Sequence, residues 1–380
     1  MQKIVVAIDS FKGSLSTFEA GEAIAEAIKD VYKDAKTVIS PIADGGEGTT
    51  EAIISATSGE MVKVVVSNPL GKKIEANYGF IPDRKTAVIE MSAAAGITLI
   101  DESERNPMNT TTFGVGEMIL DAISKGCRKF VVGIGGSATN DGGVGMLQAL
   151  GFEFLDKDGK HVELGGKGLK DIATIKTENI VPELKGCSFL VACDVKNVLC
   201  GDTGCSAIYG PQKGATPEMI KDMDLWLEKY AELTKSVIKE SDANIPGTGA
   251  AGGMGFALLS YLGATLKSGI ELVMEETGLE DQVKDADLVI TGEGRLDGQS
   301  YMGKAPVGVA KLAKKYGKLV IAFSGCVTED AAGCNEHGID AFFPIVRKPC
   351  TLEEAMNVSN AYKNLKDTAY QVFRLINTKI

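Results

Sequence analysis

The feature that most constrains the fold is an alternation of short apolar runs, each ending at glycine, aspartate or serine, with amphipathic stretches. Such runs are typical of buried strands, and the amphipathic stretches have helical spacing. Strands are expected at residues 4–8, 37–41, 130–134, 189–192, 288–291, 319–324 and 342–346. Helices are expected at residues 17–33, 48–57, 111–125, 142–150, 217–239, 304–316 and 352–375. The alternation predicts an α/β protein with a doubly wound, Rossmann-like parallel sheet.

One region departs from this alternation and indicates a second domain. Residues 61–67, 74–81 and 86–91 resemble strands separated only by turns, which is typical of antiparallel pairing. The last hundred or so residues return to the strand-then-helix order of the beginning. We therefore expect a discontinuous Rossmann-like domain of residues 1–65 plus 285–380, with residues 66–284 inserted as a second α/β domain. A chain of 380 residues is also long for a single core.

Composition excludes several classes of function. The net charge of −11, without a dense basic stripe, argues against nucleic acid and anionic membranes as partners. The sequence has no apolar run long enough to span a bilayer and opens directly on a strand-like pattern, so a cytoplasmic location is expected. Eight cysteines without a C-x-x-C pair fit a reducing compartment. With only two histidines, both in polar turns, the chemistry is expected from acids, lysine, arginine, serine and backbone amides.

The loop after the first expected strand combines acid, hydroxyl and amine groups in the sequence Asp9-Ser-Phe-Lys-Gly-Ser14. A lysine flanked by serine hydroxyls beside a helix N-terminus suits a phosphate or a carboxylate. An ordinary capped turn is the alternative interpretation. The candidate site residues of this loop are Asp9, Ser10, Lys12 and Ser14.

Two further loops carry carboxylates that are candidates for Mg²⁺. Asp44 and Glu47 lie in a glycine-rich turn before a helix, where acids also simply complement the helix dipole. Glu293 and Asp297 flank Arg295 after another apolar strand. The run from Gly298 to Lys304 matches G-x-x-x-x-G-K, but Ala305 stands where a P-loop needs Ser or Thr, so we discount a P-loop.

The longest glycine-rich loop, Gly133–Gly143, has two interpretations. Gly133–Ala138 satisfies a dinucleotide fingerprint with Glu153 downstream, which keeps an NAD(P)-dependent oxidoreductase of a small hydroxy acid as an alternative. Asn140 and Asp141 argue against it, because a carboxylate there would repel a pyrophosphate, whereas a nucleotide with its Mg²⁺ tolerates the acid. The sequence 248–255 is rich in small residues that allow close approach of either a ligand or another helix.

Together these loops predict phosphoryl transfer, in which positioning and electrostatics do most of the work. Asp194 follows a buried strand as a base or metal ligand would, and Lys213 precedes a helix. Loops at the carboxyl ends of parallel strands converge on one crevice. A non-catalytic carboxylate- or nucleotide-binding module is a third possibility, although it would need neither a base nor metal-type acids.

The motifs at residues 9–16, 43–49, 133–143, 209–215 and 292–306 resemble the bacterial glycerate kinase family, and the likeness runs nearly from end to end. The resemblance implies ATP-dependent phosphorylation of D-glycerate, commonly at the 2-hydroxyl, with Mg²⁺ as cofactor. It also implies two α/β domains with the active site in the cleft between them. A homo-oligomer is a further possibility that the sequence leaves open.

The resemblance also suggests roles for the candidate residues. Asp194 would be the base toward the glycerate hydroxyl, and Lys12 and Arg295 would share in catalysis. Asp9, Ser10, Ser14 and Lys213 would contact the substrate. The acids for Mg²⁺ would come from Asp44, Glu47, Glu293 and Asp297. Nucleotide phosphates would meet Gly135, Gly136, Ser137, Asn140, Asp141 and Gly142.

Overall fold

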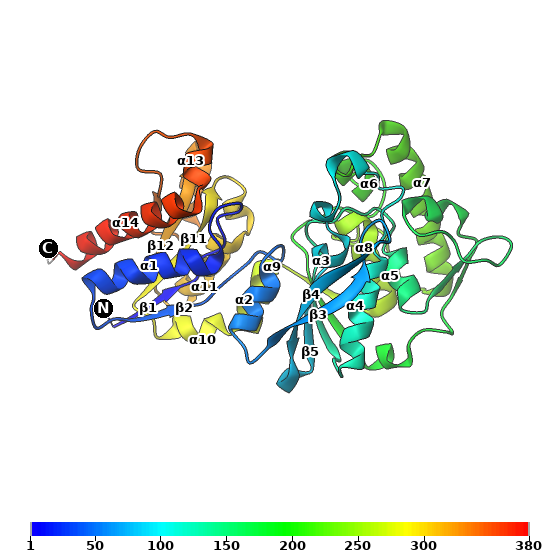
Figure 1. The fold of residues 1–380 in the computed structure, drawn as a ribbon, viewed down its shortest axis with the longest axis horizontal. Helices are drawn as coiled ribbons and strands as arrows, with labels where there is room; N and C mark the ends of the chain where they lie inside the picture. Colours follow the sequence, from blue (N-terminus) through cyan, green and yellow to red (C-terminus); the bar gives the residue numbers. More distant parts are fainter. Residues whose placement is uncertain (1, 379–380) are drawn as a thin grey trace. The chain divides into compact units, whose positions relative to one another are not determined.

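The computed structural model describes residues 2–378, which divide into two compact units. The first unit contains the described residues up to Asp44, then Glu51–Thr57, then the described residues from Ile270 onward. The second contains Gly45–Thr50 and Ser58–Gly269. The first unit thus joins the blue and the orange-to-red parts of the chain in Figure 1. The domain boundaries expected from the sequence stay a prediction.

The first unit is built on a parallel sheet with the strand order β13-β12-β11-β1-β2. Ile4 pairs with Leu288 on one side and Thr37 on the other, which fixes the register at the centre of the sheet. Residues of both faces of β1 are fully buried, as expected when helices cover a parallel sheet on both sides. The strands are β1 (Lys3–Val6), β2 (Lys36–Ile39), β11 (Leu288–Leu296), β12 (Leu319–Val327) and β13 (Ala341–Pro344).

Helices α1 (Thr17–Val31) and α14 (Val358–Asn377) pack side by side against this sheet (Figure 1). Helix α1 begins with a capping box between Ser16 and Glu19 and buries Ala20, Ile24 and Ala27 on one face, the spacing of an amphipathic helix. The unit's other helices are α10 (Leu279–Lys284), α11 (Ala305–Lys315), α12 (Gly333–Glu336), α13 (Leu352–Met356) and most of α2 (Thr49–Ser55) and α9 (Gly269–Thr277), whose first residues belong to the second unit.

The sheet has a topological switch point between β1 and β11. From β1 the chain continues to β2 on one side, whereas β11, β12 and β13 follow one another on the other side. The loops that leave β1 and β11 therefore diverge. Ligands of open α/β sheets bind in the crevice that such diverging loops leave at the carboxyl ends of the strands.

The second unit contains a mixed sheet with the strand order β10-β9-β6-β5-β4-β3. Its β3-β4 and β4-β5 pairs are antiparallel, as expected from the sequence, and the remaining pairs are parallel. The strands are β3 (Glu60–Ser67), β4 (Lys73–Ile81), β5 (Thr86–Glu90), β6 (Lys129–Gly133), β9 (Ser188–Ala192) and β10 (Thr265–Lys267). A small antiparallel pair, β7 (Glu153–Leu155) with β8 (Thr174–Lys176), stands apart.

An aromatic cluster fills the core of the second unit between its helices. Tyr230 makes edge-to-face contacts with Phe154 and Phe256 and stacks on Tyr261. The helices of this unit are α3 (Ser92–Ala95), α4 (Phe113–Ser124), α5 (Val144–Ala149), α6 (Cys205–Tyr209), α7 (Pro217–Val237) and α8 (Ala250–Leu262). The α/β fold predicted from the sequence is confirmed.

Two local expectations were wrong. The helix expected over 352–375 is two helices, because Asn357 ends α13 and caps α14 through its side chain. Strand β11 continues to Leu296, so Glu293 and Arg295 lie on a strand and not in a loop. For the small residues of 248–255 the sequence left two interpretations open. They enter helix α8, where Gly252 packs against the backbone of Thr139 and Asn140 and has no room for a side chain.

Candidate active site

The first unit contains a cavity of about 400 Å³ at the carboxyl ends of β1, β11, β12 and β13. It lies over the switch point between β1 and β11, where the fold favours a ligand. The predicted site residues among its lining are Ser10, Lys12, Ser14, Glu293, Arg295 and Asp297. The remaining lining residues are Phe11, Gly294, Lys304, Gly325, Cys326, Ile345, Val346, Leu352, Ala355, Met356, Ala361 and Asn364.

The β1–α1 loop is a closed turn that holds Lys12 at its tip. The Phe11 amide donates a hydrogen bond to the Leu15 carbonyl at 2.7 Å, and Gly13 adopts a φ of +76°, which an L side chain rarely takes. The Lys12 ammonium donates to the Asp44 carboxylate at 3.1 Å. Lys12 is thus held beside an acid at the rim of the cavity while the rest of its ammonium stays accessible.

Three acids from three neighbouring strand ends surround this lysine. Burial raises the pKa of Asp9 to about 7, and the charge of Asp44 adds to the shift. Burial likewise raises the pKa of Glu293, although a hydrogen bond from Ser300 opposes it. Burial alone would lower the pKa of Lys12, but Asp44 and Asp9 outweigh it and the pKa is raised. Groups with such shifted pKa values at strand ends are typical of functional sites.

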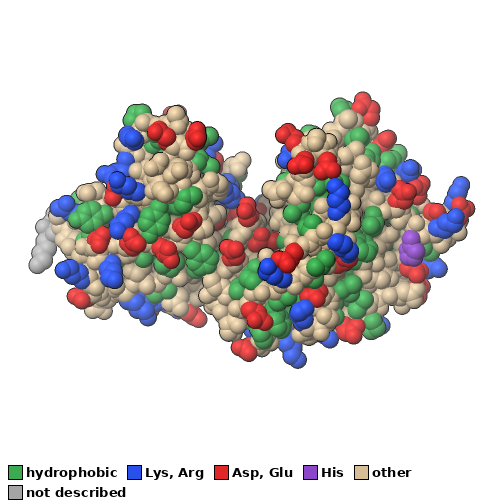
Figure 2. Space-filling view, in the orientation of Figure 1, with side chains coloured by type: hydrophobic (Ala, Val, Ile, Leu, Met, Phe, Trp, Pro, Cys, Tyr) green, Lys and Arg blue, Asp and Glu red, His purple; other side chains and the backbone are tan. Residues whose placement is uncertain are grey.

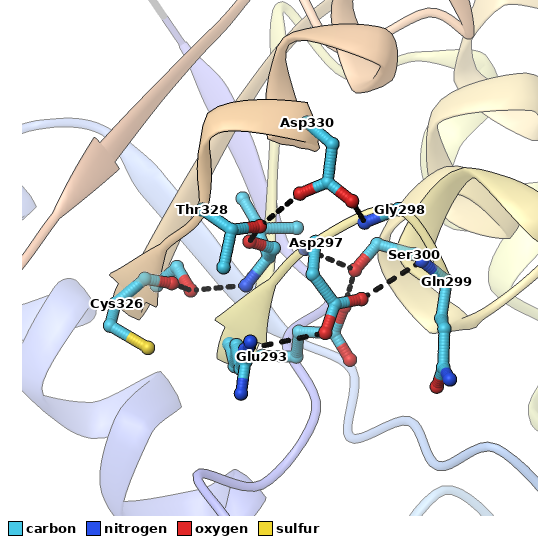
Figure 3. A network of polar contacts seen from close by, with 11 residues as sticks. Glu293, Asp297, Gly298, Gln299, Ser300, Cys326, Thr328 and Asp330 are labelled. Carbon is cyan, nitrogen blue, oxygen red and sulfur yellow. Dashed lines mark hydrogen bonds and ion pairs between the residues drawn. The ribbon is translucent and has the colours of Figure 1, made fainter.

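A polar network fixes the chain that leaves β11 (Figure 3). The Ser300 hydroxyl donates to Glu293 and accepts from the Asp297 amide at 3.1 Å. The Asp297 carboxylate accepts the Gln299 amide at 2.9 Å and lies 3.3 Å from the Arg295 guanidinium. Asp330, from the segment after β12, accepts the Gly298 amide at 2.9 Å. The network holds Glu293 and Asp297 in place and pairs the Arg295 guanidinium with Asp297.

In the second unit, Asp141 organises the glycine-rich loop from inside. Its side chain is 1% exposed and accepts hydrogen bonds from the Thr112 amide at 2.8 Å and the Thr112 hydroxyl at 2.9 Å. It also accepts the amides of Gly143 at 3.1 Å and Gly145 at 3.3 Å, at the start of α5. Because Asp141 already occupies this helix start, a dinucleotide pyrophosphate has no place there, which disfavours the oxidoreductase interpretation.

Substitution of Asp141 by alanine is expected to destabilise the protein strongly. The change leaves buried amides of Thr112, Gly143 and Gly145 without an acceptor, and each unsatisfied buried group costs about 1–3 kcal/mol. We expect the free energy of unfolding to fall by at least about 3 kcal/mol in urea titrations. A loss below about 1 kcal/mol would show that these contacts do not support the loop.

Two other predicted site residues, Lys213 from a separate segment and Asn140 of the loop itself, are buried and hydrogen-bonded within the second unit. Lys213 is 2% exposed and donates to the Ser137 hydroxyl at 2.8 Å and the Thr139 carbonyl at 2.6 Å. Burial lowers its pKa to about 8. Asn140 is fully buried and donates to the Ser206 hydroxyl at 2.8 Å. Lys213 and Asn140 therefore shape the loop, and only Gly135 and Gly136 of its predicted phosphate-binding residues are exposed.

Asp194 and Glu47 are exposed and belong to the second unit. The Asp194 carboxylate follows β9 and accepts the Gly269 amide at 3.0 Å, which orients it. Burial raises the pKa of Glu90, and the negative charge of Glu47 raises it further. Asp44 belongs to the first unit, so the two acids predicted together in one turn fall in different units.

The sequence matches the glycerate kinase family over residues 4–377. The chain belongs to this family. It is 48% identical over 371 residues to the glycerate 2-kinase of Escherichia coli K12, with 96% of this chain and 97% of the relative covered. It is 46% identical to the glycerate kinase of Bacillus subtilis 168, with 95% and 94% covered. A crystal structure from Salmonella typhimurium LT2, described as glycerate kinase 2, superposes with a TM-score of 0.90 at 46% identity and covers 99% of this chain and 98% of that one.

Within this glycerate kinase, sequence reasoning missed several residues of the cavity. Lys304 lines the cavity. Its position just before α11, at the end of a G-x-x-x-x-G-K run, could have indicated this from the sequence. Ser300 holds Glu293, and the short apolar segment around Met356 forms the opposite wall. The capping pattern of Thr351 with Glu354 marked α13, but the helical periodicity of the following residues concealed its end.

The surface of this family member carries acidic and basic side chains interspersed over the visible face, without a dense basic patch (Figure 2). Among residues 2–378, no helix is both long and apolar enough to cross a membrane. A cytoplasmic location and homo-oligomeric assembly stay predictions.

Proposed function

We propose that this protein transfers the γ-phosphate of ATP to the 2-hydroxyl of D-glycerate and forms 2-phosphoglycerate and ADP. The observation that carries the proposal is the match to glycerate kinases from end to end, with the glycerate 2-kinase of Escherichia coli among them. In the reaction, the bond between the γ-phosphorus and the β,γ-bridging oxygen breaks, and the substrate oxygen forms the new bond to phosphorus. The hydroxyl proton passes to a base.

The first unit offers the charges that this reaction needs. Lys12, Arg295 and Lys304 are cations around one cavity, and they could neutralise a transferred phosphate or a carboxylate. Ser10 and Ser14 add hydroxyls on the same side. Because a loose phosphoryl transition state spreads charge over its oxygens, fixed cations are expected to carry much of the catalysis.

We infer that one or two of the first-unit acids Asp44, Glu293 and Asp297 would hold the Mg²⁺. A cation stabilises the ionised form of a carboxyl whose pKa is raised, as it is at Glu293. The residues that the structure describes contain no group of three or more His, Cys, Asp or Glu side chains arranged as a metal site. Mg²⁺ in kinases takes few protein carboxylates and completes its shell with phosphates and water. When bound, it would neutralise nucleotide phosphate charge.

Asp194 is the proposed acceptor of the hydroxyl proton. Its carboxylate is exposed and oriented by the Gly269 amide. We expect Asp194→Asn to lower kcat by about a hundredfold or more, since general-base catalysis contributes roughly 10²–10⁴. The matched control is Asp202→Asn, another exposed acid of the second unit. Wild-type kcat in Asp194→Asn would move the base elsewhere.

The direct test is ADP release from ATP in a coupled assay with D-glycerate. The proposed function predicts turnover that requires ATP, D-glycerate and Mg²⁺ together. Reduction of NAD(P)⁺ by a hydroxy acid without ATP would instead support the oxidoreductase. Binding of ATP or glycerate without turnover would support the binding module.

A further inference from the structure

We propose that the cavity of the first unit binds the adenosine of ATP, with helix α13 as the wall against the adenine ring. The proposal rests on the kinase function proposed above and names the nucleotide site for it. It departs from the sequence-based expectation that Gly135–Gly142 receive the nucleotide. The argument comes from the chemistry of the cavity, its size, its place in the fold and the structure of its walls.

The cavity is lined by two chemically different groups of side chains. Six of them are apolar and form what we call the apolar lining: Phe11, Ile345, Val346, Leu352, Ala355 and Met356. Three are cationic: Lys12, Arg295 and Lys304. A nucleotide has the same division, since its base is a flat, largely apolar ring and its phosphates are anionic. The lining of the cavity therefore offers both kinds of contact that ATP needs.

The size of the cavity excludes glycerate as its main occupant. At about 400 Å³ it falls in the range of pockets that enclose drug-sized or nucleoside-sized ligands. Glycerate has three carbons and is covered by oxygens, so it would leave most of the apolar lining uncovered and would gain nothing from it. Its carboxylate could still meet the cations. The apolar lining needs a larger ligand with an aromatic or aliphatic face.

The fold places this cavity where nucleotides bind in open sheets. It lies at the carboxyl ends of β1 and β11, between which the strand order reverses. The segments 10–14 and 293–297 line it from these two strands. The loop of residues 133–143 differs, because its side chains at Ser137, Asn140 and Asp141 bond to the second unit's own groups.

The apolar wall is built and anchored. Helix α13 begins with a capping box between Thr351 and Glu354, and Asn357 fixes its end. The Met356 methyl lies where a side chain at Gly13 would be, so α13 packs directly on the turn that carries Lys12. Leu352 lines the cavity and is 78% exposed, so its side chain has apolar surface that a ligand would cover.

The test is Ala355→Phe, which adds a ring at the α13 wall of the cavity and leaves the three cations in the sequence. We expect the affinity for ADP, measured by calorimetry, to fall about tenfold or more, and KM for ATP to rise in parallel. Inhibition by pyrophosphate, which has no base, should stay within about twofold of wild type. Glu353→Phe is the matched control, because it adds the same ring on α13 outside the cavity and should leave ADP affinity unchanged.

Leu352→Asp provides a second variant at a position that is already exposed, so folding is not at risk. It should weaken ADP binding by replacing an apolar side chain of the wall with a carboxylate that faces the base. Wild-type ADP affinity in both Ala355→Phe and Leu352→Asp would overturn the proposal. Loss of ADP binding in Gly135→Asp with none in those two variants would assign the nucleotide to the second unit. Wild-type protein that fails to turn over ATP with D-glycerate would instead refute the proposed function.

Discussion

Replacement of Lys12 by alanine is expected to lower kcat/KM for glycerate phosphorylation by a hundredfold to a thousandfold, about the effect of removing one preorganised charge donor from a transition state. Lys12 lies on a closed turn at the cavity and is held 3.1 Å from Asp44. Its pKa is raised by the surrounding acids, so it carries its charge throughout the neutral range. Steady-state kinetics with ATP and D-glycerate measure the change.

The control for Lys12 is Lys63→Ala. Lys63 also pairs with one acid, Glu75 at 2.7 Å, but on the exposed surface of β3 and β4. Exposed ion pairs contribute little to stability, so this variant should melt near the temperature of the wild type. Lys63 does not line the cavity, so the variant should also keep wild-type kinetics. A Lys12→Ala enzyme within about threefold of wild type would remove this lysine from the active site.

Asp9→Asn is expected to stabilise the protein at pH 8. The Asp9 side chain is 3% exposed, and burial together with the charge of Asp44 raises its pKa to about 7. Around pH 4 the folded protein keeps the carboxyl protonated at no cost. As the pH rises toward 7, the unfolded chain releases the proton first, so ionisation favours unfolding. A shift of about three pKa units corresponds to about 4 kcal/mol as an upper bound at pH 8.

The measurement is urea unfolding of wild type and Asp9→Asn at pH 5 and pH 8 in the presence of EDTA. The asparagine variant should gain clearly more stability at pH 8 than at pH 5, because the penalty for keeping Asp9 in the folded protein grows until the pH passes the folded pKa of about 7. Asp34→Asn, at an exposed acid of the same unit, should show no such pH dependence. A loss of stability at pH 8 would contradict the interpretation that burial and the charge of Asp44 destabilise the ionised Asp9. A gain of stability in Asp9→Asn would be the usual trade-off at an active site, where residues kept for function often destabilise the fold.

The sequence predicted the sheet and its loops because these depend on local pattern. Apolar runs at 4–8 and 288–291 became the central strands β1 and β11, and the glycine-rich loops follow strands as expected. The grouping of Lys12, Glu293 and Arg295 around one cavity followed from the rule that carboxyl ends of parallel strands share an edge.

Tertiary contacts decided what the sequence could not. Lys213 stands before a helix as a surface lysine would, yet it is buried because its two acceptors, Ser137 and Thr139, come from a loop far away in the chain. Asp141 resembled a ligand-binding acid but caps α5 and holds Thr112. No local pattern distinguishes an acid that accepts protein amides from one that faces a ligand.

The measurement that tests the central claim most directly is phosphorus NMR of the product formed from ATP and D-glycerate in the presence of Mg²⁺. The account predicts 2-phosphoglycerate and ADP in equal amounts, with wild-type protein and not with Lys12→Ala at the same concentration and time. Formation of 3-phosphoglycerate would contradict the assignment of the 2-hydroxyl. The absence of any phosphate ester would contradict phosphoryl transfer to glycerate itself.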